Sequence, residues 1–212
     1  MKKNEFVKSL NVSRETLNSF CEYENLLSKW NEKINLVSKN TLVDIWERHF
    51  LDSGQIIKHV EASGKRWVDV GSGAGFPGLV VALLLRERRI DCDLVLVEKN
   101  PKKGFFLKEV IRKLNLSVEV VNDNIYTLEP LNADILTARA FSDLNNLIEI
   151  AFRHRKKEGI CLFLKGENYR IELDKTLNYW FFDYDIVDSL SSSSGKIIRV
   201  KQIFKRIGEQ NL

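Results

Sequence analysis

Residues 68–78 read Val-Asp-Val-Gly-Ser-Gly-Ala-Gly-Phe-Pro-Gly, and this stretch decides the fold class of the 212-residue chain. Three glycines, Gly71, Gly73 and Gly75, alternate directly after one apolar run and shortly before a second one. Glycine permits a tight turn and lets the backbone approach a ligand closely, and the amides that start the following helix then face what is bound. The stretch therefore predicts a strand, a binding turn and a helix, as in Rossmann-like folds.

The glycine spacing alone leaves the ligand open. Gly73, Gly75 and Gly78 also fit the Gly-x-Gly-x-x-Gly pattern of dinucleotide sites, with Glu98 at a suitable distance. Asp69 favours another ligand, because its carboxylate would repel the pyrophosphate of NAD and attract the ammonium and sulfonium groups of S-adenosylmethionine. Glu98 ends the next predicted strand, where it is placed to accept hydrogen bonds from ribose hydroxyls. The pattern thus favours S-adenosylmethionine over a nicotinamide cofactor.

Both carboxylates also have structural interpretations that stay open on sequence alone. Asp69 could cap the turn that follows it. Glu98 could neutralise Lys99 or Lys102 at the surface.

Outward from the glycine stretch, strand and helix patterns alternate. This alternation predicts an α/β fold, the Rossmann-like class I methyltransferase fold, with a mostly parallel seven-stranded sheet. In such a sheet ligands bind outside the carboxyl ends of the strands. The predicted strands are 66–70, 93–97, 118–121, 134–137, 159–164, 180–187 and 197–204, and the predicted helices are 77–88, 102–114, 125–128 and 143–153.

Residues 1–63 are predicted to form an N-terminal helical extension. Ser13 is a plausible N-cap for a first helix, and a second helix is expected over 42–60. The turn at 62–65 breaks the helical pattern. We therefore place the methyltransferase domain at 64–212.

Composition sets limits on the class of protein. Lys and Arg total 33 against 29 Asp and Glu, a formal charge of +4 with a pI near 8.9, which suits a polyanionic partner without requiring one. The three cysteines lie far apart, so neither a disulfide framework nor a metal site is expected. The N-terminus lacks the apolar block of a signal peptide, and the longest apolar run, 79–85, is too short to span a bilayer. We expect a cytoplasmic protein without a membrane segment.

Basic residues gather in two places that are candidates for RNA binding, the run 153–157 and the tail 196–206. Arg155 and Lys156 are the candidates in the first run, and Lys165 is a candidate phosphate contact. Solvated surface faces explain such runs about as often.

Four blocks of sequence together carry a family resemblance. They are Tyr23, Leu26, Leu27, Lys-Trp-Asn at 29–31 and Asn-Leu at 35–36; Arg-His-Phe-Leu-Asp-Ser at 48–53; the glycine stretch 69–78; and Arg-Ala-Phe at 139–141 with Leu-Lys-Gly at 164–166. In this order and spacing the chain resembles the bacterial 16S ribosomal RNA guanine-N7 methyltransferases, also called the glucose-inhibited division protein B family. The resemblance covers roughly residues 20–170.

The resemblance implies transfer of a methyl group from S-adenosylmethionine to N7 of one guanine, position 527 of 16S ribosomal RNA. It implies that Gly71 and Phe76 contact the cofactor, that Ile125 and Tyr126 lie beside its adenine, and that Arg139 lines the site. The chain departs from the family where a small residue and Glu usually stand in place of Ile125-Tyr126. The implied partner is 16S ribosomal RNA, in the small subunit or an assembly intermediate of it. We expect the protein to act as a monomer.

Guanine N7 carries an in-plane lone pair and no proton, so its methylation requires no general base. Arg139 is the expected catalytic residue, acting by position through bidentate contacts. A salt bridge to Asp134 or Asp143 is the alternative for this side chain, and the role of His49 stays open. Three other functions also stay open: a methyltransferase for protein or small molecules, a nicotinamide oxidoreductase, and a catalytically silent RNA-binding module.

Overall fold

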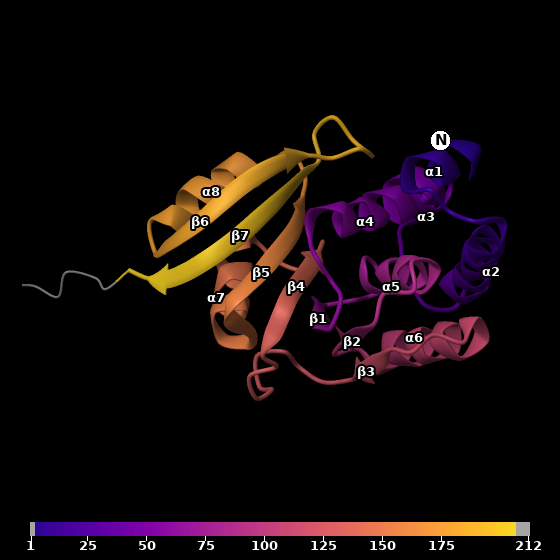
Figure 1. Ribbon diagram of the computed structural model, residues 1–212, viewed down its shortest axis with the longest axis horizontal. Helices are drawn as coiled ribbons and strands as arrows, with labels where there is room; N and C mark the ends of the chain where they lie inside the picture. Colours follow the sequence, from indigo (N-terminus) through magenta and orange to yellow (C-terminus); the bar gives the residue numbers. More distant parts are fainter. Residues whose placement is uncertain (1–2, 207–212) are drawn as a thin grey trace, which may run out of the picture.

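The computed structural model describes residues 3–206 and is organised around one seven-stranded sheet of order β3-β2-β1-β4-β5-β7-β6. Five neighbouring strands run parallel, and β7 runs antiparallel to both β5 and β6, which closes the sheet with a hairpin (Figure 1). This is the sheet expected from the sequence. The strands are β1 (Lys65–Val70), β2 (Cys92–Val97), β3 (Glu119–Val121), β4 (Ala133–Arg139), β5 (Arg155–Lys165), β6 (Trp180–Asp188) and β7 (Lys196–Lys205).

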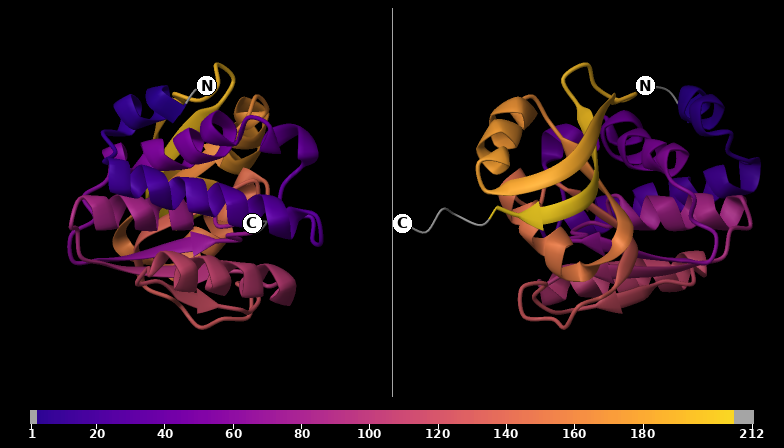
Figure 2. Two further views of the ribbon diagram at one scale, coloured as in Figure 1. Left: turned by 90° about the vertical axis from the view of Figure 1, so that its right-hand side faces the viewer. Right: turned by 60° about the vertical axis from the view of Figure 1, so that its left-hand side comes forward.

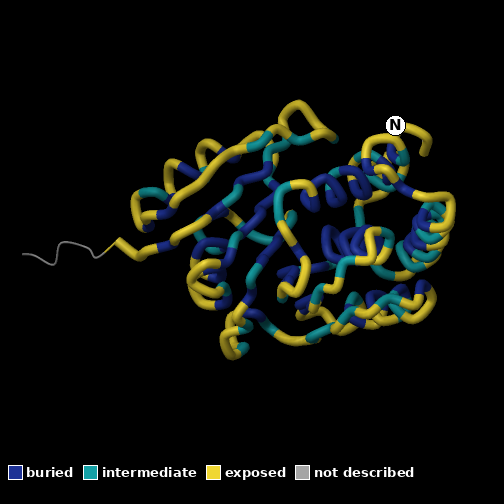
Figure 3. The backbone as a smooth tube through the Cα atoms, in the orientation of Figure 1, coloured by how far each residue is buried: buried dark blue, intermediate teal, exposed yellow. Residues whose placement is uncertain are grey.

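Helices cover both faces of the sheet, as parallel strands require. One face packs against α5 (Gly78–Glu87), α6 (Pro101–Leu114) and the N-terminal helices, and the other packs against α7 (Leu144–His154) and α8 (Tyr169–Leu177) (Figure 2). The central strand β1 and helix α5 are buried over most of their length (Figure 3). The core therefore lies directly beneath the glycine loop that joins β1 to α5.

The N-terminal part of the described chain contains helices and connecting turns but no strand, as predicted. It consists of α1 (Lys3–Leu10), α2 (Arg14–Asn31), α3 (Lys39–Leu42), the π-helical turn η1 (Trp46–Leu51), α4 (Asp52–Gly54) and the 3₁₀ turn η2 (Gln55–His59). Ser13 caps α2, because its side chain accepts a hydrogen bond from the Thr16 amide at 3.2 Å. The single helix expected over 42–60 is instead broken into π-helical, α-helical and 3₁₀ turns.

The N-terminal helices share one hydrophobic core with the sheet. The Tyr23 ring stacks on Phe76 of the glycine loop at 5.6 Å between centroids, and the Tyr23 hydroxyl donates to the Ala74 carbonyl. Gly64 has a φ of +66°, so the chain turns sharply at the expected boundary. The division at residue 64 stays a prediction, and the shared core indicates that the two parts support each other.

Two predicted elements differ from the structure, and one helix was missed. Residues 125–128 form a turn instead of a helix, in which the Thr127 amide bonds the Asn124 carbonyl at 3.0 Å. Strand β5 starts at Arg155, earlier than expected, because its first four residues are charged and hide the strand pattern. Helix α8 was not predicted, since only Tyr169, Leu173 and Thr176 of its nine residues are buried. Within residues 3–206, no helix is long and apolar enough to cross a membrane.

Candidate active site

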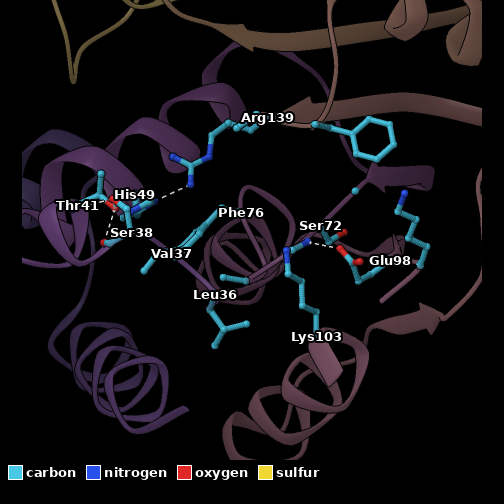
Figure 4. Close-up of a pocket in the computed structure, with 16 residues that line it drawn as sticks. Leu36, Val37, Ser38, Thr41, His49, Ser72, Phe76, Glu98, Lys103 and Arg139 are labelled. Carbon is cyan, nitrogen blue, oxygen red and sulfur yellow. Dashed lines mark hydrogen bonds between the residues drawn. The ribbon is translucent and has the colours of Figure 1, made fainter. Parts of the chain in front are cut away.

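A cavity of about 400 Å³ opens at the carboxyl ends of β1, β2 and β4, the edge at which the sequence predicts ligand binding. Figure 4 shows Arg139 and His49 on one side of it, Glu98 and Lys103 on the other, and Phe76 between them. The N-terminal segment 36–41 supplies a further wall. The lining residues are Leu36, Val37, Ser38, Thr41, His49, Gly71, Ser72, Gly73, Ala74, Phe76, Glu98, Lys99, Lys103, Arg139, Ala140 and Phe141.

The glycine loop is held to the end of β2 by its own backbone. The amides of Gly71 and Ser72 both donate to the Val97 carbonyl, at 2.9 and 3.1 Å. Gly71 has a φ of +67°, and a Cβ built on it would lie 2.0 Å from the Phe141 ring. Gly71 therefore lets the backbone and the Phe141 ring lie against each other in the cavity wall.

Asp69 lies beneath the loop and does not line the cavity. Its side chain is fully buried; one oxygen accepts from the Thr137 hydroxyl at 2.9 Å and the other from the Gly78 amide at 3.2 Å. Burial raises the pKa of the Asp69 carboxyl to about 6, against the opposing effect of these hydrogen bonds. This arrangement does not provide the direct contact between Asp69 and the ammonium and sulfonium groups of the cofactor that the sequence predicts. The carboxylate instead fixes the start of α5 under the loop, which is the capping alternative.

Glu98 joins the glycine loop to the start of α6. One carboxylate oxygen accepts from the Gly73 amide at 2.8 Å and the other from the Asn100 amide at 2.7 Å. Each carboxylate oxygen has a second lone pair, so acceptor capacity remains for hydroxyl groups of a ligand. Within the described part of the chain, Glu98 forms no ion pair with Lys99 or Lys102.

Arg139 ends β4 and is fixed by three acceptors of the N-terminal helices. Its guanidinium donates to the Arg48 carbonyl at 2.8 Å, to the Asp52 carboxylate at 3.2 Å and to His49 Nδ1 at 2.6 Å. The guanidinium carbon also lies 4.9 Å from the centroid of the Phe76 ring. The alternative of an ion pair with Asp134 or Asp143 is wrong, since the charged partner is Asp52. Asp134 instead pairs with Lys156, and Asp143 caps α7.

His49 is neutral in this environment. Burial, with the nearby charges of Arg139 and Arg48, lowers the pKa of His49 to about 3. A guanidinium only donates hydrogen bonds, so Nδ1 of His49 must accept and the imidazole proton sits on Nε2. The ring also stacks on Phe76 with centroids 4.7 Å apart. The basic nitrogen of His49 is therefore occupied and unavailable for proton abstraction.

We expect nuclear magnetic resonance to show His49 as a neutral Nε2–H imidazole from pH 8 down to about pH 4, because its pKa is depressed to about 3. The measurement is a pH series of nitrogen-15 spectra, with the His49 signal assigned through a His49→Asn variant. The chain has three histidines, so assignment is direct. Titration of His49 near the usual pKa of about 6.5 would contradict this arrangement.

The remaining predicted cofactor residues lie outside the cavity wall. Gly75 has a φ of +92°, and a Cβ there would meet the Tyr23 hydroxyl at 2.5 Å, so this glycine serves loop packing. Ile125 is buried beneath the sheet edge, with its carbonyl bonded to His154 Nε2 at 2.9 Å. Tyr126 is exposed. Contacts of Ile125 and Tyr126 with adenine stay predictions.

The three predicted RNA-binding residues are all engaged with the protein. Arg155 and Lys156 start β5, so they lie at the opposite edge of the sheet, about 30 Å along the strand from the cavity at about 3.3 Å per residue. Arg155 donates to the Gly159 carbonyl at 2.9 Å, and Lys156 pairs with Asp134 at 2.8 Å. Lys165 pairs with Glu172 at 2.6 Å and is nearly buried, which leaves it poorly placed as a phosphate contact.

Lysines at the mouth of the cavity were missed by sequence reasoning. A second hollow of about 320 Å³ adjoins the first, and Lys103 lines both. Lys33, Lys99 and Lys102 are exposed here, and among residues 3–206 none of these lysines has an acidic partner within ion-pair distance. The available signal was position, because Lys99 follows a predicted strand and Lys102 and Lys103 begin the next predicted helix, so all three lie at the binding edge. We call Lys33, Lys99, Lys102 and Lys103 the lysine rim.

The cavity fits S-adenosylmethionine by its volume and by its donor and acceptor groups. Pockets for ligands of this size typically range from about 300 to 1,000 Å³. A Cβ at Gly71 would fill the space that the glycine loop leaves open for a ligand, and Glu98 offers carboxylate oxygens next to that space. No group of three or more potential metal ligands occurs within residues 3–206.

Solved structures of other proteins share this fold. A SAM dependent methyltransferase from Aquifex aeolicus aligns with a TM-score of 0.56 at 15% identity, over 71% of this chain and 89% of that one. M. jannaschii TYW2 in complex with AdoMet aligns with a TM-score of 0.51 at 17% identity, over 83% of this chain and 80% of that one. With the glycine loop and Glu98 at the expected edge, the fold is that of the Rossmann-like S-adenosylmethionine-dependent methyltransferases.

Sequence comparison identifies the family within that class. The family model for rRNA small subunit methyltransferase G, GidB, matches residues 16–202. The ribosomal RNA small subunit methyltransferase G of Ruegeria pomeroyi is 41% identical over 192 residues, covering 91% of this chain and 94% of that protein. Its counterpart in Paramagnetospirillum magneticum is 40% identical over 199 residues, covering 94% and 95%. The chain belongs to the rRNA small subunit methyltransferase G family, which confirms the resemblance found in the sequence.

Proposed function

We propose that this chain methylates N7 of a single guanine of 16S ribosomal RNA, at position 527, and that it does so in the cytoplasm as a monomer acting on the small subunit or an assembly intermediate of it. The names of its relatives support a small-subunit RNA acceptor. The choice of N7 rests on the resemblance and on the chemistry of the cavity.

The observation that carries the choice of N7 is the pair formed by His49 and Arg139. Among the residues that line the cavity, His49 has its basic nitrogen occupied by Arg139 at 2.6 Å, and Glu98 has both oxygens bonded to backbone amides. Such a cavity suits an acceptor atom that already has a free lone pair. Guanine N7 is such an atom, whereas an exocyclic amine must lose a proton.

S-adenosylmethionine, when bound, supplies an electrophilic methyl group on its sulfonium. The residues of this chain then contribute alignment and exclusion of water rather than proton transfer. Gly71 and Glu98 hold the cofactor side of the cavity. Phe76 lies between the two sides of the cavity, and Arg139 forms the opposing wall, where the base would enter.

We expect charge reversal at Lys102 and Lys103 to weaken RNA binding by about tenfold or more at physiological salt. These lysines stand at the cavity mouth without acidic partners among the described residues, and each neutralised phosphate steepens the salt dependence of binding by about one unit. The measurement is RNA affinity against salt concentration for Lys102→Glu/Lys103→Glu. The melting temperature should stay close to that of the wild type, and Lys102→Glu alone should leave cofactor affinity unchanged, because Lys102 lines only the second hollow.

The matched variant is Arg155→Glu/Lys156→Glu, at the other end of the sheet. It tests the sequence-based prediction that these two residues bind RNA. A larger loss in this variant than in the rim variant, with folding intact, would contradict the proposal that RNA approaches over the lysine rim.

The proposed function is tested by incubating the protein with labelled S-adenosylmethionine and small subunits that lack their own modification. We expect one labelled guanine in 16S ribosomal RNA, located by chain cleavage at N7-methylguanine. Label on another atom or on ribosomal protein would overturn the proposed acceptor while leaving the methyltransferase class intact.

A further inference from the structure

The carboxylate of Asp52 connects the cavity wall to a distant loop. One oxygen accepts from the Arg139 guanidinium at 3.2 Å, and the other accepts from the Ser191 hydroxyl at 2.6 Å. Gln55 Nε2 and the Ser189 hydroxyl donate to that second oxygen over longer distances, 3.2 and 3.3 Å, so Ser191 makes its shortest contact. These partners lie 87 and 139 positions along the chain from Asp52. Asp52 itself follows the π-helical turn that carries Arg48 and His49. Three parts of the chain therefore meet at one side chain that is 20% exposed.

The loop between β6 and β7 is fixed to the N-terminal helices at more than this one point. The Leu190 amide donates to Gln55 Oε1 at 2.7 Å, and Gln55 Nε2 donates to the Ser189 hydroxyl at 2.9 Å. Gln55 is almost fully buried, at 1% exposure. The hydroxyls of Ser189 and Ser191 lie 2.8 Å apart. The loop is thus held rigidly enough for Ser191 to orient the Asp52 carboxylate.

We propose that Asp52 is the positioning residue of the methyl-transfer site: it holds the Arg139 guanidinium in the cavity wall, and Ser191 of the β6–β7 loop holds Asp52. The other two acceptors of Arg139, the Arg48 carbonyl and His49 Nδ1, are neutral. All three hydrogen bonds have the ionised guanidinium as donor, but only Asp52 adds the attraction of an opposite full charge, so Asp52 contributes most to fixing the guanidinium.

The positioning role of Asp52 rests on the proposed function in one respect, because kcat is measured as methyl transfer to ribosomal RNA. It has a second readout that needs no RNA. The Arg139 guanidinium donates to His49 Nδ1, so displacement of Arg139 removes that hydrogen bond and shifts the His49 Nδ1 nitrogen signal. Absence of methyl transfer to ribosomal RNA by the wild-type protein would overturn the proposed acceptor. An unmoved His49 signal in the variants would overturn the positioning role of Asp52.

The first variant is Asp52→Asn, which keeps the shape of the side chain and removes its charge. We expect kcat to fall about 10- to 100-fold while the dissociation constant for S-adenosylmethionine changes less than about threefold, because a charged hydrogen bond in a partly buried site is weakened. The His49 Nδ1 signal should shift in the same variant. An unchanged His49 signal would overturn the proposal whatever the value of kcat, because the Arg139 guanidinium would then not have moved.

The second variant separates the loop contact from general loop damage. Ser191→Ala is expected to lower kcat about 3- to 10-fold in the same direction, and Ser191→Thr, which keeps the hydroxyl, should restore it. Ser193→Ala is the matched control, since Ser193 is exposed on the same loop. Equal losses in Ser191→Ala and Ser193→Ala, or no rescue by threonine, would overturn the role of Ser191.

Discussion

Replacement of Arg139 by alanine is expected to slow methyl transfer about 100- to 1,000-fold, the range found when a preorganised polar group is removed from an active site. The change removes three hydrogen bonds, the contact with Phe76 and part of the cavity wall. It also leaves the Asp52 carboxylate without its charged partner. The measurement is the single-turnover rate on small subunits with labelled S-adenosylmethionine.

Arg139→Lys should recover only a small part of this loss. A lysine keeps the charge but lacks the planar fork that reaches the Arg48 carbonyl, Asp52 and His49 at once. Arg66→Ala is the matched control, because that guanidinium also bonds one backbone carbonyl, that of Leu131 at 3.0 Å, and one carboxylate, that of Asp93, at the start of β1 and away from the cavity. A rate for Arg139→Ala within about threefold of the wild type would contradict the role given to this residue.

The second large effect is expected from Gly71→Ala, which should weaken S-adenosylmethionine binding about 100-fold or more. An added Cβ would lie 2.0 Å from the Phe141 ring, so either the glycine loop or the ring must move within the cofactor cavity. The residue is also held at a φ of +67°, which costs an L-residue roughly 1 kcal/mol. Calorimetric titration with the cofactor measures the loss.

Gly64→Ala separates the two causes. Gly64 has nearly the same φ, +66°, and a Cβ there meets nothing within 4 Å. We expect Gly64→Ala to lower the melting temperature slightly and to leave cofactor affinity unchanged. If both variants bound the cofactor equally well, the close packing of Gly71 against Phe141 would not be what forms the site.

The parallel part of the fold was predictable because its signals are local. The strands β1 and β2 are short apolar runs, and the glycine stretch between β1 and α5 permits few structures other than a binding turn. The same reasoning placed Gly71, Phe76, Glu98 and Arg139 at the edge where the cavity lies. Predicting that a residue lies at the carboxyl ends of the strands requires only the order of strands and loops along the chain.

The direction of a side chain was much harder to predict. Asp69 was expected in the cavity because it stands next to the loop, yet it points to Thr137 and the Gly78 amide. Residues along a strand alternate between its two sides, and a sequence without a known register does not say which side faces the ligand.

The long-range contacts around Arg139 could not be predicted either, because they depend on how distant segments of the chain pack together. Nothing in the spacing of Arg139 and Asp52 indicates that they meet across 87 positions, or that Ser191 joins them. The run 153–157 was assigned to RNA by its charge, but that assignment depends on where β5 starts. Because the strand starts at Arg155, the charges lie at the far edge of the sheet.

We propose that the methyl group goes to N7 of one guanine in 16S ribosomal RNA. This claim is tested most directly with reconstituted small subunits that carry either guanine or 7-deazaguanine at position 527, compared in single-turnover transfer from labelled S-adenosylmethionine. We predict full labelling of the guanine subunits and none of the 7-deazaguanine subunits, which lack only the acceptor nitrogen. Equal labelling of both would contradict the claim.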